Sequence, residues 1–129
     1  MEVTSLANKI ELVNERLMFY IDCGTTFSFE SVYKDQAGDP IDVSGYSARL
    51  SFKDRVGGTE HFRLTESDGI SVGTTDGKFT ATISDVRTAL LQSGGYGKKG
   101  VCAMEVESPG GVVVRLFDGL WVSSPEVVD

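Results

Sequence analysis

Residues that commonly build catalytic and metal sites are scarce in this sequence. Its 129 residues include only 2 cysteines and 1 histidine, and the cysteines do not have the spacing of metal ligands. A catalytic triad or a zinc site built on His61 would need partners at motif spacing, and no such set is expected. The sequence therefore predicts a protein that is not an enzyme, with no catalytic residue, metal or cofactor.

Basic residues and long apolar runs are also few. The 12 Lys and Arg residues are outnumbered by 19 Asp and Glu, for a net charge of −7. This charge repels phosphate backbones and anionic membranes, so neither nucleic acid nor a membrane is an expected partner. The longest apolar runs, such as residues 17–21, are too short to cross a bilayer, and the N-terminal stretch has no signal-peptide pattern. We expect a soluble protein made in a reducing cytosol, although a Cys23–Cys102 disulfide stays open.

The dominant pattern is alternation of apolar and polar residues between turn signals. In residues 46–52, Tyr46, Leu50 and Phe52 alternate with serines and Arg49, and a period of two places these sets on opposite faces of a strand. Turn residues recur about every 8–12 positions, as in an antiparallel sandwich of about seven to nine strands. The expected strands are residues 16–22, 25–34, 46–52, 61–65 (an edge strand), 70–72, 78–84, 101–107 and 112–123.

Two interruptions of this pattern carry specific expectations. Residues 85–92 read as one or two helical turns, capped by Ser84 or Asp85, with Val86, Ala89 and Leu90 packed inward. The Asp118-Gly119 pair in the last strand suggests a β-bulge.

The chain divides into an arm, one domain and a tail. Residues 15–124 form the expected β-sandwich domain, with neither an internal repeat nor a linker, and residues 125–129 form a C-terminal tail. Residues 1–14 are ambiguous, because Leu6, Ile10, Val13 and Leu17 fit a helical stripe while Ile10 and Leu12 fit a strand. A short helix and an extended arm that packs on a neighbouring copy both stay open.

Three groups of residues have a functional and a structural interpretation. Asp35, Asp39 and Asp42 could bind calcium, but aspartates in turns usually cap backbone groups. The segment 93–100 (SGGYGKKG) is the locally basic spot, without the spacing of a phosphate-binding loop. The aromatic set of Tyr96, Phe117 and Trp121 could form a sugar platform, although core or interface positions fit a sandwich better.

Several segments, in order, match a known pattern. They include residues 21–27 (IDCGTTF), 39–50 (DPIDVSGYSARL), 115–119 (RLFDG) and 122–127 (VSSPEV). This order resembles small immunoglobulin-like modules of tailed bacteriophages, including the N-terminal domain of phage baseplate upper proteins. Segment 39–50 is the most specific part, whereas Cys23-Gly24-Thr25 departs from the commoner Gly-Asp-Thr and residues 97–100 interrupt a strand. The N-terminal arm lies outside the resemblance.

The resemblance implies an immunoglobulin-like fold and a structural protein of the virion, made in the host cytoplasm. Such modules dock on a tail, baseplate or fibre as assembly or adaptor units. Their partners are other virion structural proteins and copies of themselves, not a small-molecule substrate. A capsid decoration protein is the nearest alternative, and a carbohydrate-binding or host-adhesion module is the alternative from another class.

The expected interface residues come from two places. Leu6, Ile10 and Leu12 are apolar residues of the arm with no assigned position in the sandwich. Lys98 and Lys99 form a basic loop on an acidic protein, which favours docking by charge contrast.

Overall fold

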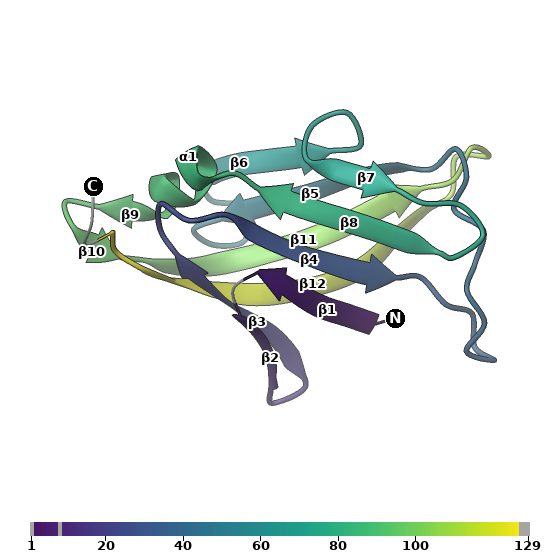
Figure 1. Ribbon diagram of the computed structural model, residues 1–129, viewed down its shortest axis with the longest axis horizontal. Coiled ribbons are helices and arrows are strands. Elements are labelled where there is room, and N and C mark those ends of the chain that lie inside the picture. The colour runs from purple at the N-terminus through teal and green to yellow at the C-terminus, as the bar shows by residue number, and fades with distance from the viewer. Residues whose placement is uncertain (1, 8, 127–129) are drawn as a thin grey trace.

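Two β-sheets packed face to face make up the domain in the computed structural model, which describes residues 2–7 and 9–126 (Figure 1). One sheet has the strand order β1-β4-β8-β7 and the other the order β2-β3-β12-β11-β5-β6. The expected all-β sandwich is confirmed. The strands are β1 (Glu2–Ala7), β2 (Lys9–Val13), β3 (Arg16–Asp22), β4 (Phe27–Val32), β5 (Ser47–Lys53), β6 (Glu60–Thr65), β7 (Ile70–Val72), β8 (Lys78–Ile83), β9 (Gln92–Ser93), β10 (Tyr96–Gly97), β11 (Lys99–Glu107) and β12 (Val113–Ser124).

Strand pairing is antiparallel with one exception. Among the described strands only β12 and β3 run parallel, with Trp121 opposite Phe19. A parallel pair needs a long crossover connection, and here most of the domain lies between the two strands. The edge position expected for residues 61–65 is confirmed, since β6 pairs only with β5.

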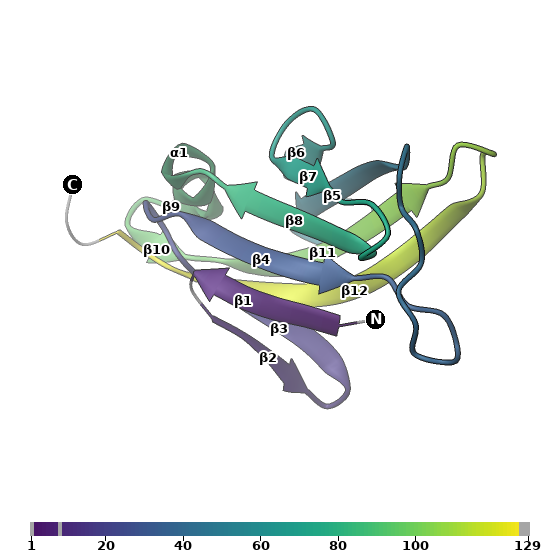
Figure 2. The ribbon, with the colours of Figure 1, turned by 45° about the vertical axis from the view of Figure 1, so that its right-hand side comes forward.

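The ambiguous N-terminal segment is extended, so its helical alternative is wrong. Strand β1 pairs with β4 at the edge of the four-stranded sheet, and β2 pairs with β3 at the edge of the six-stranded sheet. The chain thus divides its first two strands between the two sheets (Figures 1 and 2). A two-residue turn, Asn14-Glu15, then joins β2 to β3.

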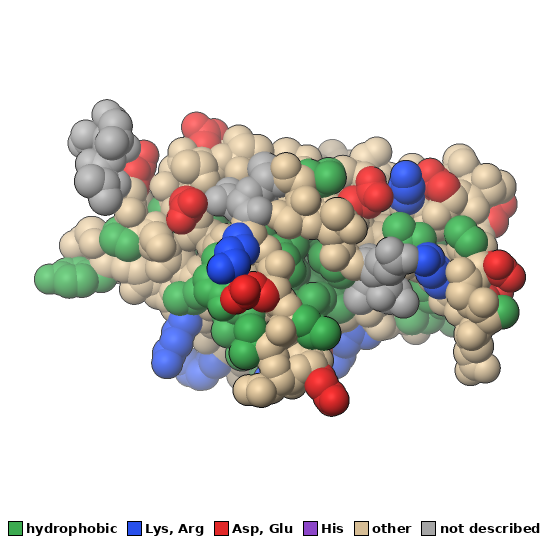
Figure 3. Space-filling view, turned by 60° about the horizontal axis from the view of Figure 1, so that its bottom comes forward, with side chains coloured by type: hydrophobic (Ala, Val, Ile, Leu, Met, Phe, Trp, Pro, Cys, Tyr) green, Lys and Arg blue, Asp and Glu red, His purple; other side chains and the backbone are tan. Residues whose placement is uncertain are grey.

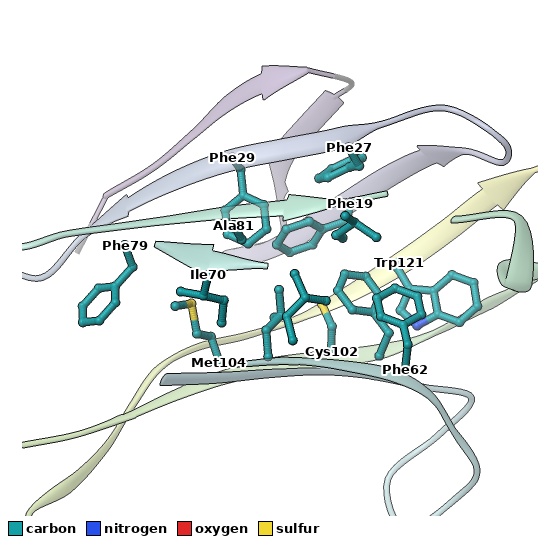
Figure 4. Packing of buried hydrophobic residues seen from close by; sticks show 14 of the residues in the cluster. Phe19, Phe27, Phe29, Phe62, Ile70, Phe79, Ala81, Cys102, Met104 and Trp121 are labelled. Atoms are coloured by element: carbon teal, nitrogen blue, oxygen red, sulfur yellow. The ribbon is translucent and has the colours of Figure 1, made fainter. Parts of the chain in front are cut away.

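Aromatic side chains hold the sheets together. Phe19 of β3 is fully buried and makes edge contacts with Phe29 of β4 and Phe52 of β5, at ring distances of 5.4 and 6.1 Å. It also stacks on Phe117 of β12 at 5.7 Å. Figure 4 shows side chains of both sheets meeting in this layer. Burial of each such ring contributes about 1.5–3 kcal/mol.

The bulge in β12 lies at Leu116, not at Asp118-Gly119. Met104 of β11 is opposite Phe117 and Glu105 is opposite Arg115, which leaves Leu116 as the extra residue. Asp118 and its neighbour pair regularly with β11. The bulge shifts the alternation, so that even-numbered residues face the core before it and odd-numbered residues after it.

The helical turns occur where expected but bury other residues. They are α1 (Asp85–Thr88), capped by the Ser84 hydroxyl, which accepts from Arg87 N at 3.2 Å, and the 3₁₀ turn η1 (Ala89–Leu91). Val86 is 71% exposed and Leu90 51%, whereas Thr88 and Leu91 are buried. The expected inward set is wrong for Val86 and Leu90, because the turns present Thr88 and Leu91, three residues apart, to the interior, while Ala89 is half-buried.

Thr88 is held inside by hydrogen bonds. Its hydroxyl donates to Thr25 O at 2.7 Å and accepts from Gly24 N at 3.1 Å, so α1 is fastened to the turn before β4.

None of the helical turns in the described residues has the length or apolar character to cross a lipid bilayer. Of the expected tail, residues 127–129 lie outside the described residues, and Glu126 N donates to the Gln92 side-chain oxygen at 2.8 Å.

Gly100 provides a test of the packing around the single tryptophan. A Cβ there would lie 2.1 Å from Lys53 O and 2.6 Å from Trp121 Nε1. We expect Gly100→Ala to lower the free energy of unfolding by about 3 kcal/mol, because backbone atoms of β5 must move. Denaturant unfolding measures this change.

Gly110→Ala is the matched control, because the nearest atom to its added Cβ is Ser108 Oγ at 3.8 Å. It should change the free energy of unfolding by less than about 1 kcal/mol. Equal losses for the two variants would contradict the packing described for Gly100.

Candidate protein interface

The one histidine is a packing residue at the sheet edge. The His61 ring makes an edge contact with Trp121 at 5.6 Å, and its Nε2 is buried without a hydrogen-bond partner among the described residues. Burial lowers the pKa of His61, and the nearby Lys98 lowers it further, against an opposing effect of Asp54. Among the described residues, no carboxylate accepts a hydrogen bond from this Nε2.

One stretch does match the nucleophile pattern G-x-S-x-G, contrary to the expectation that the sequence holds no such motif set. It is residues 69–73 (GISVG), with Ser71 in the middle. That pattern requires a sharp turn from a strand into a helix, whereas Ser71 lies within β7 and is paired with Thr80 of β8. It also lies in the other sheet from His61. The match is therefore a strand segment rather than a nucleophile elbow.

Two of the three aspartates of the β4–β5 loop, Asp35 and Asp42, cap backbone groups, as the structural interpretation predicts. Asp35 Oδ1 accepts from Ala37 N at 2.9 Å and from Asp39 N at 3.0 Å. Asp42 Oδ1 accepts from Ser44 N and from its hydroxyl, and these bonds lower the pKa of Asp42. Within the described residues, no three His, Cys, Asp or Glu side chains are placed to hold a metal ion.

Both cysteines are free thiols in the core. Cys23 and Cys102 are buried, and no disulfide joins them. Desolvation raises the pKa of each thiol, most strongly for Cys102. Because the thiolate is the reactive form, these cysteines behave as small apolar residues.

The three aromatic residues do not form a platform. Trp121 is buried, and its Nε1 donates to Lys53 O at 3.0 Å and Val101 O at 3.1 Å. Phe117 is also buried, while Tyr96 is 77% exposed in the β9–β10 hairpin. The core interpretation is confirmed for the first two rings. Only Tyr96 is left for a carbohydrate site.

An open groove between β1 and the β2–β3 hairpin contains several apolar side chains and is a candidate interface. We call it the N-terminal groove. It encloses about 570 Å³ and is lined by Val3, Thr4, Ile10, Glu11, Leu12, Glu15, Leu17, Phe117 and Asp118. Figure 3 views this side of the molecule, where apolar side chains gather with single charged groups among them.

The groove exists because the first two strands diverge. Ile10 and Leu12 lie on the inner face of β2, opposite Phe19 and Leu17 of β3. Ile10 and Leu17 pack against the core, but Leu12 is 69% exposed although it faces inward. Strand β1 belongs to the other sheet, beside β4, and its ribbon diverges from that of β2 (Figure 2).

Two edge strands flank the groove. Among the described strands, β1 has only β4 as a neighbour and β2 has only β3. Free edges accept an added strand through main-chain hydrogen bonds. An extended segment could thus bind to an edge and place apolar side chains beside Leu12.

The hairpin that carries Leu12 has a strained turn. Asn14 and Glu15 both have positive φ, at 51° and 66°, as a two-residue type I′ hairpin turn requires. Asparagine tolerates this conformation, but glutamate rarely adopts it. Glu15 also lines the groove, so a residue unfavourable to the turn stands at the candidate interface.

The structure places the expected interface residues in different positions. Ile10 and Leu12 line the groove, while Leu6 is an exposed bulge residue of β1 that does not. Lys98 and Lys99 are exposed where β11 begins, and neither lines the groove. Val3 and Phe117 also contribute to the groove but were not expected, because their role depends on which strands lie at the sheet edges.

Comparisons with known proteins give no match. A scan against models of protein families finds none that fits this sequence, and a search of curated proteins also finds none.

His61 predicts a pH dependence of stability. Because the fold lowers its pKa from the ordinary 6.5, the unfolded chain takes up a proton before the folded chain does. The free energy of unfolding should therefore fall as the pH decreases through 6.5, by at most about 1.4 kcal/mol per pH unit. Denaturant unfolding of wild type and His61→Phe tests this, and an unchanged slope in the variant would contradict it.

Relief of the turn strain gives a second prediction. We expect Glu15→Gly to raise the free energy of unfolding by about 1 kcal/mol, because glycine adopts positive φ without a Cβ penalty. Asn14→Gly, the neighbouring control, should raise it less. A loss of stability in Glu15→Gly, measured by denaturant unfolding, would show that the turn is not strained.

Proposed function

We propose that this protein is a non-enzymatic assembly module that docks on a partner protein through its N-terminal groove. The observation that carries the proposal is Leu12, which faces the inside of a sandwich and is still 69% exposed. An inward-facing apolar side chain without a cover is a place where a partner can supply the missing contact.

The groove suits an extended, apolar segment of that partner. Covering Leu12 would contribute about 1.5–3 kcal/mol, and Ile10 and Leu17 already form a packed floor. The free edge of β1 or β2 would supply main-chain hydrogen bonds to the added strand. This mode needs no charged ligand and no chemistry, in agreement with the lack of a catalytic arrangement around His61.

The resemblance to immunoglobulin-like phage modules supplies the biological setting of the proposal. In that setting the partner is a virion structural protein, and the module joins a tail, baseplate or fibre as an adaptor. A capsid decoration protein would use the same docking chemistry at many symmetry-related sites. The number of copies per purified particle, measured by quantitative mass spectrometry, distinguishes the two. A ratio near one per major capsid subunit favours decoration, and a much smaller ratio favours the tail.

A carbohydrate-binding or adhesion role is the second candidate. It rests on the exposed ring of Tyr96, because Trp121 and Phe117 are buried. A sugar site usually pairs an aromatic ring with polar groups in a concave surface, and Tyr96 lines neither the N-terminal groove nor the hollow described below. The assembly role therefore has the stronger support.

Leu12→Asp tests the docking proposal. The side chain is mostly exposed in the free protein, so the free energy of unfolding should change by less than about 1 kcal/mol. A charge buried against an apolar partner should instead lower the number of copies incorporated into particles by about tenfold or more. Copies of wild type and variant are counted in purified particles.

Val86→Asp is the control, because Val86 is an exposed aliphatic residue on α1, away from the groove. It should be incorporated like wild type. Normal incorporation of Leu12→Asp would overturn the role of the groove, and absence of the wild-type chain from particles would overturn the virion setting.

A further inference from the structure

The outer face of the six-stranded sheet has a basic hollow on an otherwise acidic protein. The hollow encloses about 320 Å³, and five cations line it together with only two carboxylates. The whole chain has a net charge of −7. Because the hollow itself is net positive, the residues outside it carry a net charge more negative than −7. The cations are Arg16, Arg49, Lys53, Arg63 and Arg115.

Residue size explains the hollow. Ser51 of β5 and Ala103 of β11 face each other across neighbouring strands and point outward. They are short, whereas the cations around them come from β3, β5, β6 and β12 and have long side chains. The short side chains form the floor of the hollow, and the long basic side chains form its rim.

Part of the positive charge is not neutralised within the molecule. Glu105 accepts two hydrogen bonds from Arg49, at 2.9 and 3.1 Å, and its other oxygen lies 3.7 Å from Arg115. Arg63 pairs with Glu60 at 3.1 Å. Arg16 and Lys53, in contrast, form no ion pair with any described residue. The hollow thus has two cations without a direct carboxylate partner, although the charge of Lys53 also acts on Glu60, its partner in the β5–β6 pair.

The β4–β5 loop has the complementary charge, because it carries three aspartates and one lysine. Its residues 35–40 project beyond the ends of the strands in both ribbon views (Figures 1 and 2). Asp35 and Asp42 cap the loop backbone and stiffen it. Asp39 lies near the tip, exposed, and its carboxylate makes no hydrogen bond or ion pair to another described residue. A stiff loop loses little conformational entropy on binding.

We propose that the β4–β5 loop of one copy docks in the basic hollow of a second copy, with Asp39 opposite Lys53 and Arg16. The contact joins two different surfaces, so it is head-to-tail and extends into rings or filaments rather than a two-fold dimer. Two hollows cannot face each other, because their like charges repel. This surface adjoins the N-terminal groove, because Asp118 lines both, but Lys53 and Arg16 line only the hollow, and the inference stands whether or not the groove binds a partner.

The test is self-association of the purified chain, measured by sedimentation velocity at low and high salt. Wild type should form higher species at about 20 mM NaCl and dissociate at about 500 mM NaCl, since screening shortens the range of charge attraction. Asp39→Lys and Lys53→Glu should each weaken association by about tenfold or more. A chain carrying both changes should recover association, because the opposed charges are exchanged rather than lost.

Asp22→Asn is a control for net charge, because Asp22 is exposed at the end of β3, outside both surfaces. It should associate like wild type. Arg16→Gln is a second hollow variant, and thermal unfolding verifies that every variant folds. A monomer at every salt concentration, or association that both single variants leave unchanged, would overturn the proposal. Binding of a short DNA duplex in place of self-association would also overturn it.

Discussion

Ring packing around Phe19 is the interaction on which the rest of the structure depends. This side chain contacts Phe29 of one sheet and Phe52 and Phe117 of its own, so it sets the distance between the two layers. Once the layers are fixed, the edges beside β3 and β4 are open, and β2 and β1 occupy them separately. The N-terminal groove follows from this division, because no single strand can cover both edges.

The two proposed binding surfaces use different physics on different parts of the sandwich. The groove lies between the sheets and presents apolar side chains beside two edge strands, which favours an extended segment of a partner. The hollow lies on the outer face and presents guanidinium and ammonium groups above a floor of small residues, which favours an acidic loop. One surface would join the protein to another chain, and the other would join its own copies.

Local pattern predicted much of the sandwich, because alternation reports which face of a strand is buried. Strand β3 has the expected bounds, and Met104 of β11 faces the core as expected. The pattern could not assign residues 1–14, since their pairing depends on which sheet edges stay open. It could not place the bulge at Leu116, which depends on register with β11. The alternation pattern also could not predict the hollow, because the cations that line it lie on strands far apart in sequence.

Photo-crosslinking from position 12 is the sharpest test of docking through the N-terminal groove. A photoreactive residue replaces Leu12 in one sample and Val86 in another, and both are irradiated in assembled particles. If the proposed virion setting holds, docking through the groove should yield a covalent adduct to a virion protein from position 12 and none from position 86. Adducts confined to the same chain at position 12, with the protein present in the particle, would contradict docking through the groove.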